Sequence, residues 1–139
     1  MTLDLFATEA RQDLAPGALL LRGFALDAAP ALLEAAAAVQ AAAPLRRMRT
    51  PGGLTMQVAM TNCGELGWVS DARGYRYQPT DPLSDERWPA LPAAFAALAR
   101  DAAEAAAYAG FAPDACLVNR YEPGTKLSLH QDRDEQDYA

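Results

Sequence analysis

The sequence predicts one α+β domain, and three observations support that prediction. Two alanine-rich stretches, at residues 31–43 and 93–108, consist mainly of strong helix formers. Apolar segments near residues 17–24, 54–62 and 115–122 have the composition or the period-two alternation of strands. The chain has 139 residues, 51% of them hydrophobic, and no repeat or low-complexity linker divides it. That length suits one domain with one core.

The first part of the chain should contain a strand followed by a helix. Residues 17–24 centre on an apolar run, which indicates a buried strand. Asp27 is the expected N-cap of the helix, Pro30 falls in its first turn, and Pro44 stops it. The second helix should end at Gly110 in the C′ position. Both helices have narrow apolar faces, so we expect them to support a sheet.

The remaining strands are expected between and after the helices. Residues 54–62 alternate between apolar and polar side chains, which predicts a half-buried strand. Residues 64–82 are rich in Gly, Trp, Tyr and Arg and predict neither a helix nor an obvious part of the core. A strand is expected at 115–122, followed by a tight turn at Pro123 and Gly124 and a return strand through 127–130.

Composition limits the classes of function. No segment approaches the length of a membrane span and the N-terminus lacks the features of a signal peptide, so we expect a cytoplasmic protein that does not contact membranes. A net charge of −6 argues against broad, nonspecific binding to nucleic acid. A local basic surface on an acidic body stays possible, and solvated arginines are the alternative; the arginines concerned are Arg46, Arg47, Arg49, Arg73 and Arg76.

The two cysteines, Cys63 and Cys116, lie far apart in the sequence. We expect two free, mostly buried thiols, with a single disulfide as the alternative. A zinc site built from both cysteines and His130 is possible by count, but nothing in the spacing supports it.

His130, the only histidine, is followed two residues later by Asp132. In extended backbone, side chains at i and i+2 project to the same side, so the two groups can bind one metal ion. They supply two of the three protein ligands of the 2-His-1-carboxylate triad that holds ferrous iron. The third ligand would have to come from sequence beyond Ala139. The alternative is a surface histidine beside a solvated acidic run, because the H-x-D spacing alone is weakly specific.

Polar and aromatic residues near this motif favour a ligand site. Asn119 and Tyr121 share one face of the expected strand, where they suit an anionic, carbonyl-bearing ligand better than a plain core. The segment around Trp68 combines aromatic and basic residues, as in sites that stack a base and hold phosphates. A hydrophobic latch with solvated arginines is the alternative for that segment. Met56, Val58 and Met60 fit core packing better than a substrate floor.

Taken together, the motifs resemble the AlkB family of iron(II)- and 2-oxoglutarate-dependent dioxygenases, which repair alkylated bases. The resemblance extends from Leu3 to about Asp137. The segments that carry it are Thr50-Pro51-Gly52-Gly53, Val58-Ala59-Met60-Thr61-Asn62-Cys63-Gly64, Leu66-Gly67-Trp68, Gly74-Tyr75, Tyr77, Asp81-Pro82, Trp88-Pro89-Ala90, Pro113-Asp114-Ala115-Cys116-Leu117, Asn119-Arg120-Tyr121, Pro123-Gly124, Lys126-Leu127-Ser128-Leu129-His130-Gln131-Asp132 and Asp134-Glu135.

The resemblance implies an incomplete double-stranded β-helix, or jelly roll, with N-terminal helices and a nucleotide-recognition lid. Residues 1–139 would form a single incomplete domain. About residues 1–90 would be the N-terminal extension and substrate lid, and about 91–139 the supporting helix and first jelly-roll strands. The family's distal iron histidine and the arginines that pair with 2-oxoglutarate are expected after Ala139.

Carried over residue by residue, the resemblance assigns roles. His130 and Asp132 would be the catalytic iron ligands. Asn119, Arg120 and Tyr121 would contact 2-oxoglutarate. The implied substrate-binding residues are Thr50 near the nucleic-acid backbone, Trp68 stacked on the extruded base with Met60 nearby, Tyr75, Arg76 and Tyr77 on phosphates or sugar, and Asp134 on the base edge.

The implied reaction removes methyl groups from 1-methyladenine and 3-methylcytosine, using Fe(II), 2-oxoglutarate and O2 and releasing formaldehyde, succinate and CO2. The expected partner is alkylated single-stranded DNA, with double-stranded DNA or RNA as further substrates, and the protein is expected to be a monomer. We expect these 139 residues alone to be inactive. The alternatives are an oxygenase acting on RNA or protein and a non-catalytic fragment that binds single-stranded nucleic acid.

Overall fold

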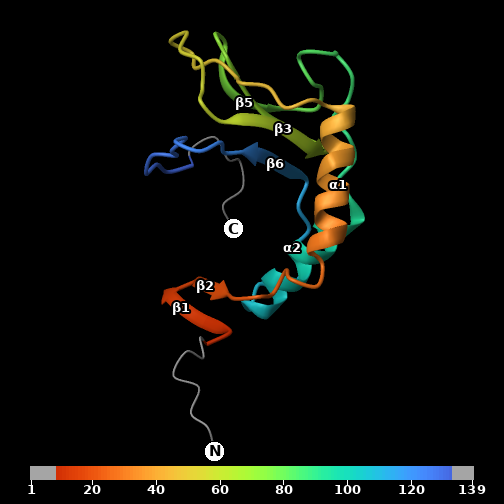
Figure 1. Ribbon diagram of the computed structural model, residues 1–139, viewed down its shortest axis with the longest axis vertical. Helices are drawn as coiled ribbons and strands as arrows, with labels where there is room; N and C mark the ends of the chain where they lie inside the picture. The colour runs from red at the N-terminus through yellow and green to blue at the C-terminus, as the bar shows by residue number, and fades with distance from the viewer. Residues whose placement is uncertain (1–8, 133–139) are drawn as a thin grey trace, which may run out of the picture.

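The computed structural model describes residues 9–132, which form an α+β arrangement. The elements in chain order are β1 (Arg11–Ala15), β2 (Ala18–Leu21), α1 (Ala29–Ala42), β3 (Ala59–Gly64), β4 (Gly67–Asp71), β5 (Gly74–Gln78), α2 (Ala93–Ala105) and β6 (Ala115–Arg120). Within the described residues the strands pair as three antiparallel ribbons, β1 with β2, β3 with β6 and β4 with β5. Figure 1 shows α1 and α2 along one side, with β3, β5 and β6 at one end and β1 and β2 at the other.

Strand β3 is buried on both faces, which corrects the prediction of a half-buried strand over 54–62. Residues Ala59 to Cys63 are all buried. The polar members of the strand tolerate burial because each has a backbone partner: the Thr61 hydroxyl donates to the Ala43 carbonyl at 2.7 Å, and Asn62 bonds to the backbone of Trp68. Strand β3 also begins at Ala59 rather than near residue 54, so the period-two pattern located only part of the strand and misjudged its burial.

The segment 64–82 contains two strands and no helix. The expectation that it contributes no obvious part of the core was wrong, because Val69 is a core residue. Strands β4 and β5 form a hairpin in which Asp71 and Gly74 are the last paired residues. Gly74 has φ of +106°, a conformation that favours glycine at the end of a tight turn. Val69 is 2% exposed and belongs to the core. Aromatic residues alternating on both sides of a short turn are the signal that identifies such a hairpin.

Helix α1 begins without the expected side-chain cap. Ala28 is its N-cap residue, with no capping hydrogen bond from a side chain, so the assignment of Asp27 as N-cap was wrong. Pro30 does lie in the first turn, where a missing N–H costs nothing. The helix ends before Pro44, as expected.

Helix α2 ends earlier than predicted and by a different residue. Its C′ position is Ala107, with φ of +68°, rather than Gly110. The Tyr108 N–H donates to the Ala103 carbonyl at 2.8 Å and the Ala107 N–H to the Glu104 carbonyl at 3.0 Å, which is the Schellman pattern. Two correctly placed hydrogen bonds thus offset the cost of a left-handed alanine.

The N-terminal ribbon is exposed, which corrects the prediction of a buried strand over 17–24. Strand β2 lies within that range but pairs with β1, which the sequence pattern did not reveal, and Leu20 is 39% exposed. The Tyr108 hydroxyl donates to the Gly17 carbonyl at 2.8 Å, so the ribbon is tied to the end of α2.

The core lies around β3 and β4, and a buried ion pair borders it. Its buried members are Ala43, Met48, Val58, Met60, Val69 and Trp88, with Met56 and Trp68 packed against them. Arg46 forms a bidentate pair with Asp81, at 2.6 and 2.7 Å, and its guanidinium lies 5.3 Å from the centre of the Trp88 ring. Within residues 9–132, no helix is long and apolar enough to cross a membrane.

Candidate metal and nucleic-acid site

His130 and Asp132 lie side by side on an extended segment after the turn. The Thr125 N–H donates to the Glu122 carbonyl at 2.9 Å, so the expected turn is present. The expected return strand over 127–130 is not formed, and Leu129 is fully exposed, because β6 has no partner strand on this side within the described residues. The two side chains still meet: His130 Nε2 lies 3.4 Å from Asp132 Oδ1, and both groups are solvent-accessible.

The hydrogen bonding of His130 suits metal ligation. Its Nδ1 lies 2.9 Å from the Ser128 carbonyl oxygen, which accepts only hydrogen bonds. In the neutral tautomer that donates from Nδ1 to this oxygen, Nε2 keeps its lone pair for a metal ion and lies on the side of Asp132. Two ligands of one octahedral cation, each about 2.1 Å from it, lie roughly 3 Å apart when adjacent. The pair fits a metal ion as two of its ligands, and residues 9–132 contain no cluster of three or more His, Cys, Asp or Glu side chains that would complete the set.

Strand β6 presents polar groups at its exposed end. Asn119 Nδ2 donates to the Tyr121 hydroxyl oxygen at 3.4 Å, so these side chains share a face, as the spacing predicts. Arg120 points to the other face, where its guanidinium lies 3.5 Å from the Glu122 carboxylate. Of the three residues expected to contact 2-oxoglutarate, the structure thus brings together Asn119 and Tyr121 and separates Arg120 from them.

An aromatic pair stands on the β4–β5 hairpin. The Trp68 and Tyr75 rings are stacked, with centroids 5.5 Å apart and planes inclined by 15°. Trp68 faces Tyr77 and Ser70 faces Tyr75 in the strand register, so all four side chains lie on the same face of the hairpin.

Arg76 lies on the opposite face of the hairpin from these aromatic rings. It donates to both Asp71 carboxylate oxygens, at 2.8 and 2.9 Å, and to the Gln78 side chain at 2.8 Å. These hydrogen bonds from Arg76 hold the pKa of Asp71 well below its usual range. Arg76 is thus already paired in this structure, whereas the aromatic rings leave ring surface exposed.

The other expected substrate residues are spread around this hairpin. Met60 is 7% exposed and belongs to the core, with Trp68 packed against that cluster. Thr50 closes a turn, since its hydroxyl accepts from the Leu54 N–H at 3.1 Å. The Ser70 hydroxyl donates to the Arg49 carbonyl at 2.6 Å, which ties the Thr50 segment to β4. Asp134 lies outside the described residues.

Asn62 is a residue of the candidate site whose role was not predicted from the sequence: it positions the backbone of Trp68. It is fully buried, its Nδ2 donates to the Trp68 carbonyl at 3.0 Å, and its Oδ1 accepts from the Trp68 N–H at 2.9 Å. No sequence pattern indicated this role, because both hydrogen bonds go to main-chain groups of Trp68. The pair connects β3, which is bonded to β6, with the aromatic hairpin.

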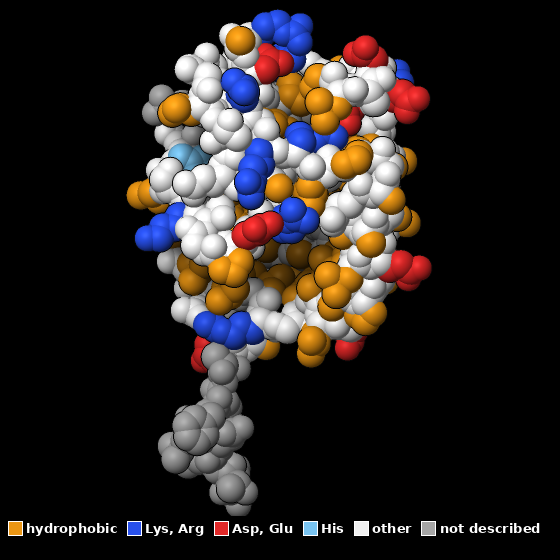
Figure 2. All heavy atoms as spheres, turned by 45° about the horizontal axis from the view of Figure 1, so that its top comes forward, with side chains coloured by type: hydrophobic (Ala, Val, Ile, Leu, Met, Phe, Trp, Pro, Cys, Tyr) orange, Lys and Arg blue, Asp and Glu red, His pale blue; other side chains and the backbone are white. Residues whose placement is uncertain are grey.

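The arginines of the expected basic surface are mostly paired. Arg46 pairs with Asp81, and the guanidinium of Arg73 lies 3.7 Å from the Asp71 carboxylate. Arg76 pairs with the same Asp71, as described above. Arg47 and Arg49 are exposed. Figure 2 shows basic side chains across the face formed by the β3 and β5 end of the molecule, acidic side chains mainly toward its edges, and a hollow lined by hydrophobic side chains. The positive potential is therefore local and partly neutralised.

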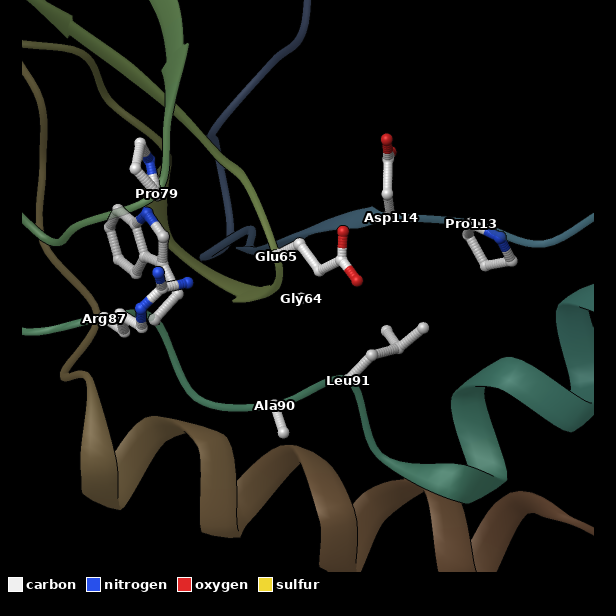
Figure 3. Close-up of a pocket in the computed structure, with 9 residues that line it drawn as sticks. Gly64, Glu65, Pro79, Arg87, Ala90, Leu91, Pro113 and Asp114 are labelled. Carbon is white, nitrogen blue, oxygen red and sulfur yellow. The ribbon is translucent and has the colours of Figure 1, made fainter.

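A separate cavity of about 380 Å³ opens at the far end of β3. Gly64, Glu65 and Asp114 form part of its wall, and Figure 3 shows them opposite Ala90 and Leu91, with the Asp114 carboxylate pointing away from these two residues. None of the residues expected to bind iron, 2-oxoglutarate or substrate lines this cavity. It is therefore distinct from the metal pair and the aromatic hairpin.

Comparison with known proteins decides the family. The family model of the 2OG-Fe(II) oxygenase superfamily matches residues 17–139. The chain belongs to that superfamily. Its members have a jelly-roll fold and use Fe(II), 2-oxoglutarate and O2.

Curated relatives within this superfamily agree with the resemblance to AlkB. The chain is 61% identical over 137 residues to the alpha-ketoglutarate-dependent dioxygenase AlkB of Salmonella typhimurium and 54% identical to that of Escherichia coli. Each alignment covers 97% of this chain and 63% of the relative. The AlkB homolog of Caulobacter vibrioides is 45% identical over 112 residues, which cover 81% of this chain and 49% of that protein. The chain thus spans less than two thirds of the length of these relatives, and its resemblance to AlkB is confirmed.

Proposed function

We propose that this chain carries the substrate lid, the first 2-oxoglutarate contacts and two iron ligands of an oxidative demethylase acting on N-methylated bases in nucleic acid. The observation that carries the proposal is the Asn62–Trp68 connection, because it joins a partly exposed aromatic stack to the strand bonded to β6. A base-binding surface and a 2-oxoglutarate surface then belong to one rigid unit. The division near residue 90 into lid and jelly-roll parts remains a prediction.

The metal-binding end supports an iron-dependent reaction. His130 and Asp132 would hold Fe(II), which with 2-oxoglutarate and O2 supplies oxidation of the N-methyl group. The Ser128 carbonyl keeps the imidazole proton on Nδ1, so that Nε2 faces the metal position. Asn119 and Tyr121 offer an amide and a hydroxyl as donors to the anionic co-substrate.

The aromatic hairpin supports a base as the substrate. A base methylated at N1 of adenine or N3 of cytosine carries a positive charge and has lost its pairing edge, so flipping it out costs less and an aromatic face attracts it. Trp68 would stack on the flipped base, with Tyr75 and Tyr77 beside it and Asp134 on the base edge. Thr50 would approach the backbone of the nucleic acid, and Arg76 would reach a phosphate only by exchanging its contact with Asp71.

The 139 residues by themselves are proposed to be inactive. Two protein ligands bind ferrous iron weakly, and His130 and Asp132 are both solvent-accessible. A cytoplasmic location and a monomeric state remain predictions.

A turnover assay tests the proposal. A full-length version carrying this chain is incubated with Fe(II), ascorbate, 2-oxoglutarate and a single-stranded oligonucleotide containing 1-methyladenine, and formaldehyde and succinate are measured. We expect both products with the methylated oligonucleotide and neither from the 139-residue chain. The His130→Ala variant is the matched negative control.

Three results would contradict the proposal. Succinate formation that depends on a methylated peptide but not on the oligonucleotide would indicate a protein substrate. Iron-independent binding of single-stranded DNA without turnover would indicate a binding module. Robust formaldehyde release from the 139-residue chain alone would contradict its predicted inactivity. The same assay with double-stranded DNA and with RNA carrying the same lesion compares their turnover with that of single-stranded DNA.

A further inference from the structure

Cys63 and Cys116 face each other across the β3–β6 ribbon. They are directly opposed in its register, and both are free thiols. Opposed residues of an antiparallel pair project to the same side of the sheet with Cα atoms about 4.5 to 5.5 Å apart. Disulfides span Cα separations of about 4.4 to 6.8 Å, so the Cα separation of an opposed pair falls within their range. The Cys63 Sγ lies 3.9 Å from the Cys116 carbonyl oxygen, so a rotation of the side chains brings the two sulfurs together.

The two thiols differ in access and in chemistry. Cys63 is fully buried, whereas Cys116 is partly exposed. A hydrogen bond from the Cys63 thiol lowers the pKa of Cys116 to about 7, although burial opposes that change. The same contact, together with burial, raises the pKa of Cys63. Cys116 is therefore the thiol with both thiolate character and a path to solvent, which are the conditions for reaction with an oxidant.

We propose that Cys63 and Cys116 form a reversible cross-strand disulfide when the protein meets a hydroperoxide, with Cys116 as the reacting thiol and Cys63 as the resolving thiol. This inference does not depend on the proposed demethylase activity. It concerns a covalent modification site in the sheet that carries the expected substrate and 2-oxoglutarate residues.

The chemistry balances in two steps. The Cys116 thiolate attacks one peroxide oxygen: an S–O bond forms, the O–O bond breaks, and hydroxide leaves and takes up a proton to become water. The Cys63 sulfur then attacks the Cys116 sulfur: the S–S bond forms, the S–O bond breaks, and the Cys63 proton leaves with the hydroxide as a second water. Two thiols are oxidised and one hydrogen peroxide is reduced.

The position of the bond gives it a structural effect. Cys63 follows directly after Asn62, which holds Trp68, and Cys116 lies on the strand that carries Asn119. A covalent link here would lock the register of β3 against β6 and close a loop through both the aromatic hairpin and α2. Oxidation should therefore raise the temperature of unfolding, and a thiol reductant should reverse the rise.

Mass spectrometry with thiol counting tests the proposal. Purified protein is treated with hydrogen peroxide and then alkylated under denaturing conditions. We expect a tryptic peptide pair linked through Cys63 and Cys116, a loss of both thiols from alkylation, and full recovery of both after dithiothreitol. Retention of both thiols under conditions that oxidise free glutathione would overturn the proposal, as would sulfinic acid at Cys116 with Cys63 still a thiol.

Single variants test the assigned roles. In Cys63→Ser, Cys116 should be trapped as a sulfenic acid by dimedone; in Cys116→Ser, Cys63 should stay a thiol because it is buried. Oxidation of Cys63 in Cys116→Ser at the rate seen in the unsubstituted protein would reverse the roles and contradict the proposal. Circular dichroism checks that each variant folds, and the linked peptide from the unsubstituted protein decides the matter if one does not.

Discussion

The side chain of Asn62 binds both the N–H and the carbonyl of Trp68, at 2.9 and 3.0 Å, from a position with no solvent exposure. A primary amide in this arrangement replaces one step of a strand ladder, so it sets where the indole projects. Trp68 in turn stacks on Tyr75. The buried amide thus determines the position of the surface that is proposed to receive a base.

Asn62→Ala should lower stability and weaken base binding together. It leaves the N–H and the carbonyl of Trp68, which are partly buried, without their partner, and each such loss costs about 1 kcal/mol or more. Urea unfolding and oligonucleotide titration measure the two effects. Asn119→Ala is the control for stability, because Asn119 is exposed on the neighbouring strand and its loss should change the free energy of unfolding by less than about 0.5 kcal/mol. Equal losses in both variants would show that Asn62 has no special role.

Trp68→Ala should reduce affinity for a single-stranded oligonucleotide carrying 1-methyladenine. Stacking of a base on an aromatic ring contributes about 1 to 3 kcal/mol, so the dissociation constant should rise roughly 5- to 150-fold. Trp68→Phe retains a ring and should recover most of the affinity. Fluorescence anisotropy of a labelled oligonucleotide gives both values, and an unchanged constant in Trp68→Ala would exclude this ring as the base platform.

His130→Ala and Asp132→Ala should each weaken metal binding in a full-length version by more than about 10-fold. Removing a residue that only hydrogen-bonds to a metal ligand already lowers affinity by about that factor, so removing the ligand itself should cost more. Titration with Mn²⁺, followed by its electron paramagnetic resonance signal, measures this affinity without turnover. Asp101→Asn, an exposed carboxylate on α2, is the control and should change nothing. Unchanged affinity in both alanine variants would place the metal elsewhere.

Asp81→Asn should destabilise the fold by about 3 kcal/mol, because removing one member of a buried pair leaves the other charge without its partner. Both side chains are well buried, at 13% exposure for Arg46 and 5% for Asp81. Burial alone would raise the pKa of Asp81, but hydrogen bonds from Arg46 and the Leu83 N–H outweigh it and hold the pKa below its usual value.

The pH dependence of the same pair follows from that direction. A carboxyl group whose pKa is lower in the folded state stabilises the fold above its unfolded pKa of about 3.9, and this contribution disappears as pH falls through the folded pKa. The unsubstituted protein should therefore lose stability below pH ~4 more steeply than Asp81→Asn. Chemical unfolding between neutral and acidic pH compares the two slopes, and parallel slopes would contradict the assignment.

Gly67→Ala should destabilise the aromatic hairpin. A Cβ atom at Gly67 would lie 2.3 Å from Trp88 Nε1 and 2.9 Å from Asn62 Cβ, so two anchored side chains would have to move. Overpacking of this kind costs about 1 to 3 kcal/mol. Gly52→Ala is a matched control, since the nearest atom to its Cβ would be 3.9 Å away. Thermal unfolding of both variants checks the difference, and equal midpoints would contradict the packing explanation.

The sequence predicted the elements with local signals and missed those that depend on distant partners. Both helices and the strand at 115–120 were found from composition and alternation. The end of α2 was misplaced because Ala107, with no sequence signal for a left-handed conformation, is held there by backbone hydrogen bonds. Strand β1 was missed because an exposed strand has no apolar pattern to reveal it.

The parts of the candidate site that depend on short sequence spacing were predictable. The approach of His130 to Asp132 and of Asn119 to Tyr121 follows from residues two apart in extended backbone. The position of Arg76 away from the aromatic rings did not emerge, because residues 64–82 were not recognised as strands and their alternation was therefore not applied. Asn62 needed the three-dimensional structure, since its partner is a main-chain group.

Side chains along β3 alternate between two faces with different contacts. Met60 and Asn62 contact the hairpin that carries Trp68, whereas Thr61 and Cys63 lie on the face that contacts the end of α1 and Cys116. A single substitution in β3 should therefore disturb the contacts of one face only. Insertion or deletion of one residue would exchange the two faces all at once, turning a thiol toward the indole and an amide toward the helix. We therefore expect β3 to tolerate a substitution at a single position better than a change in its length.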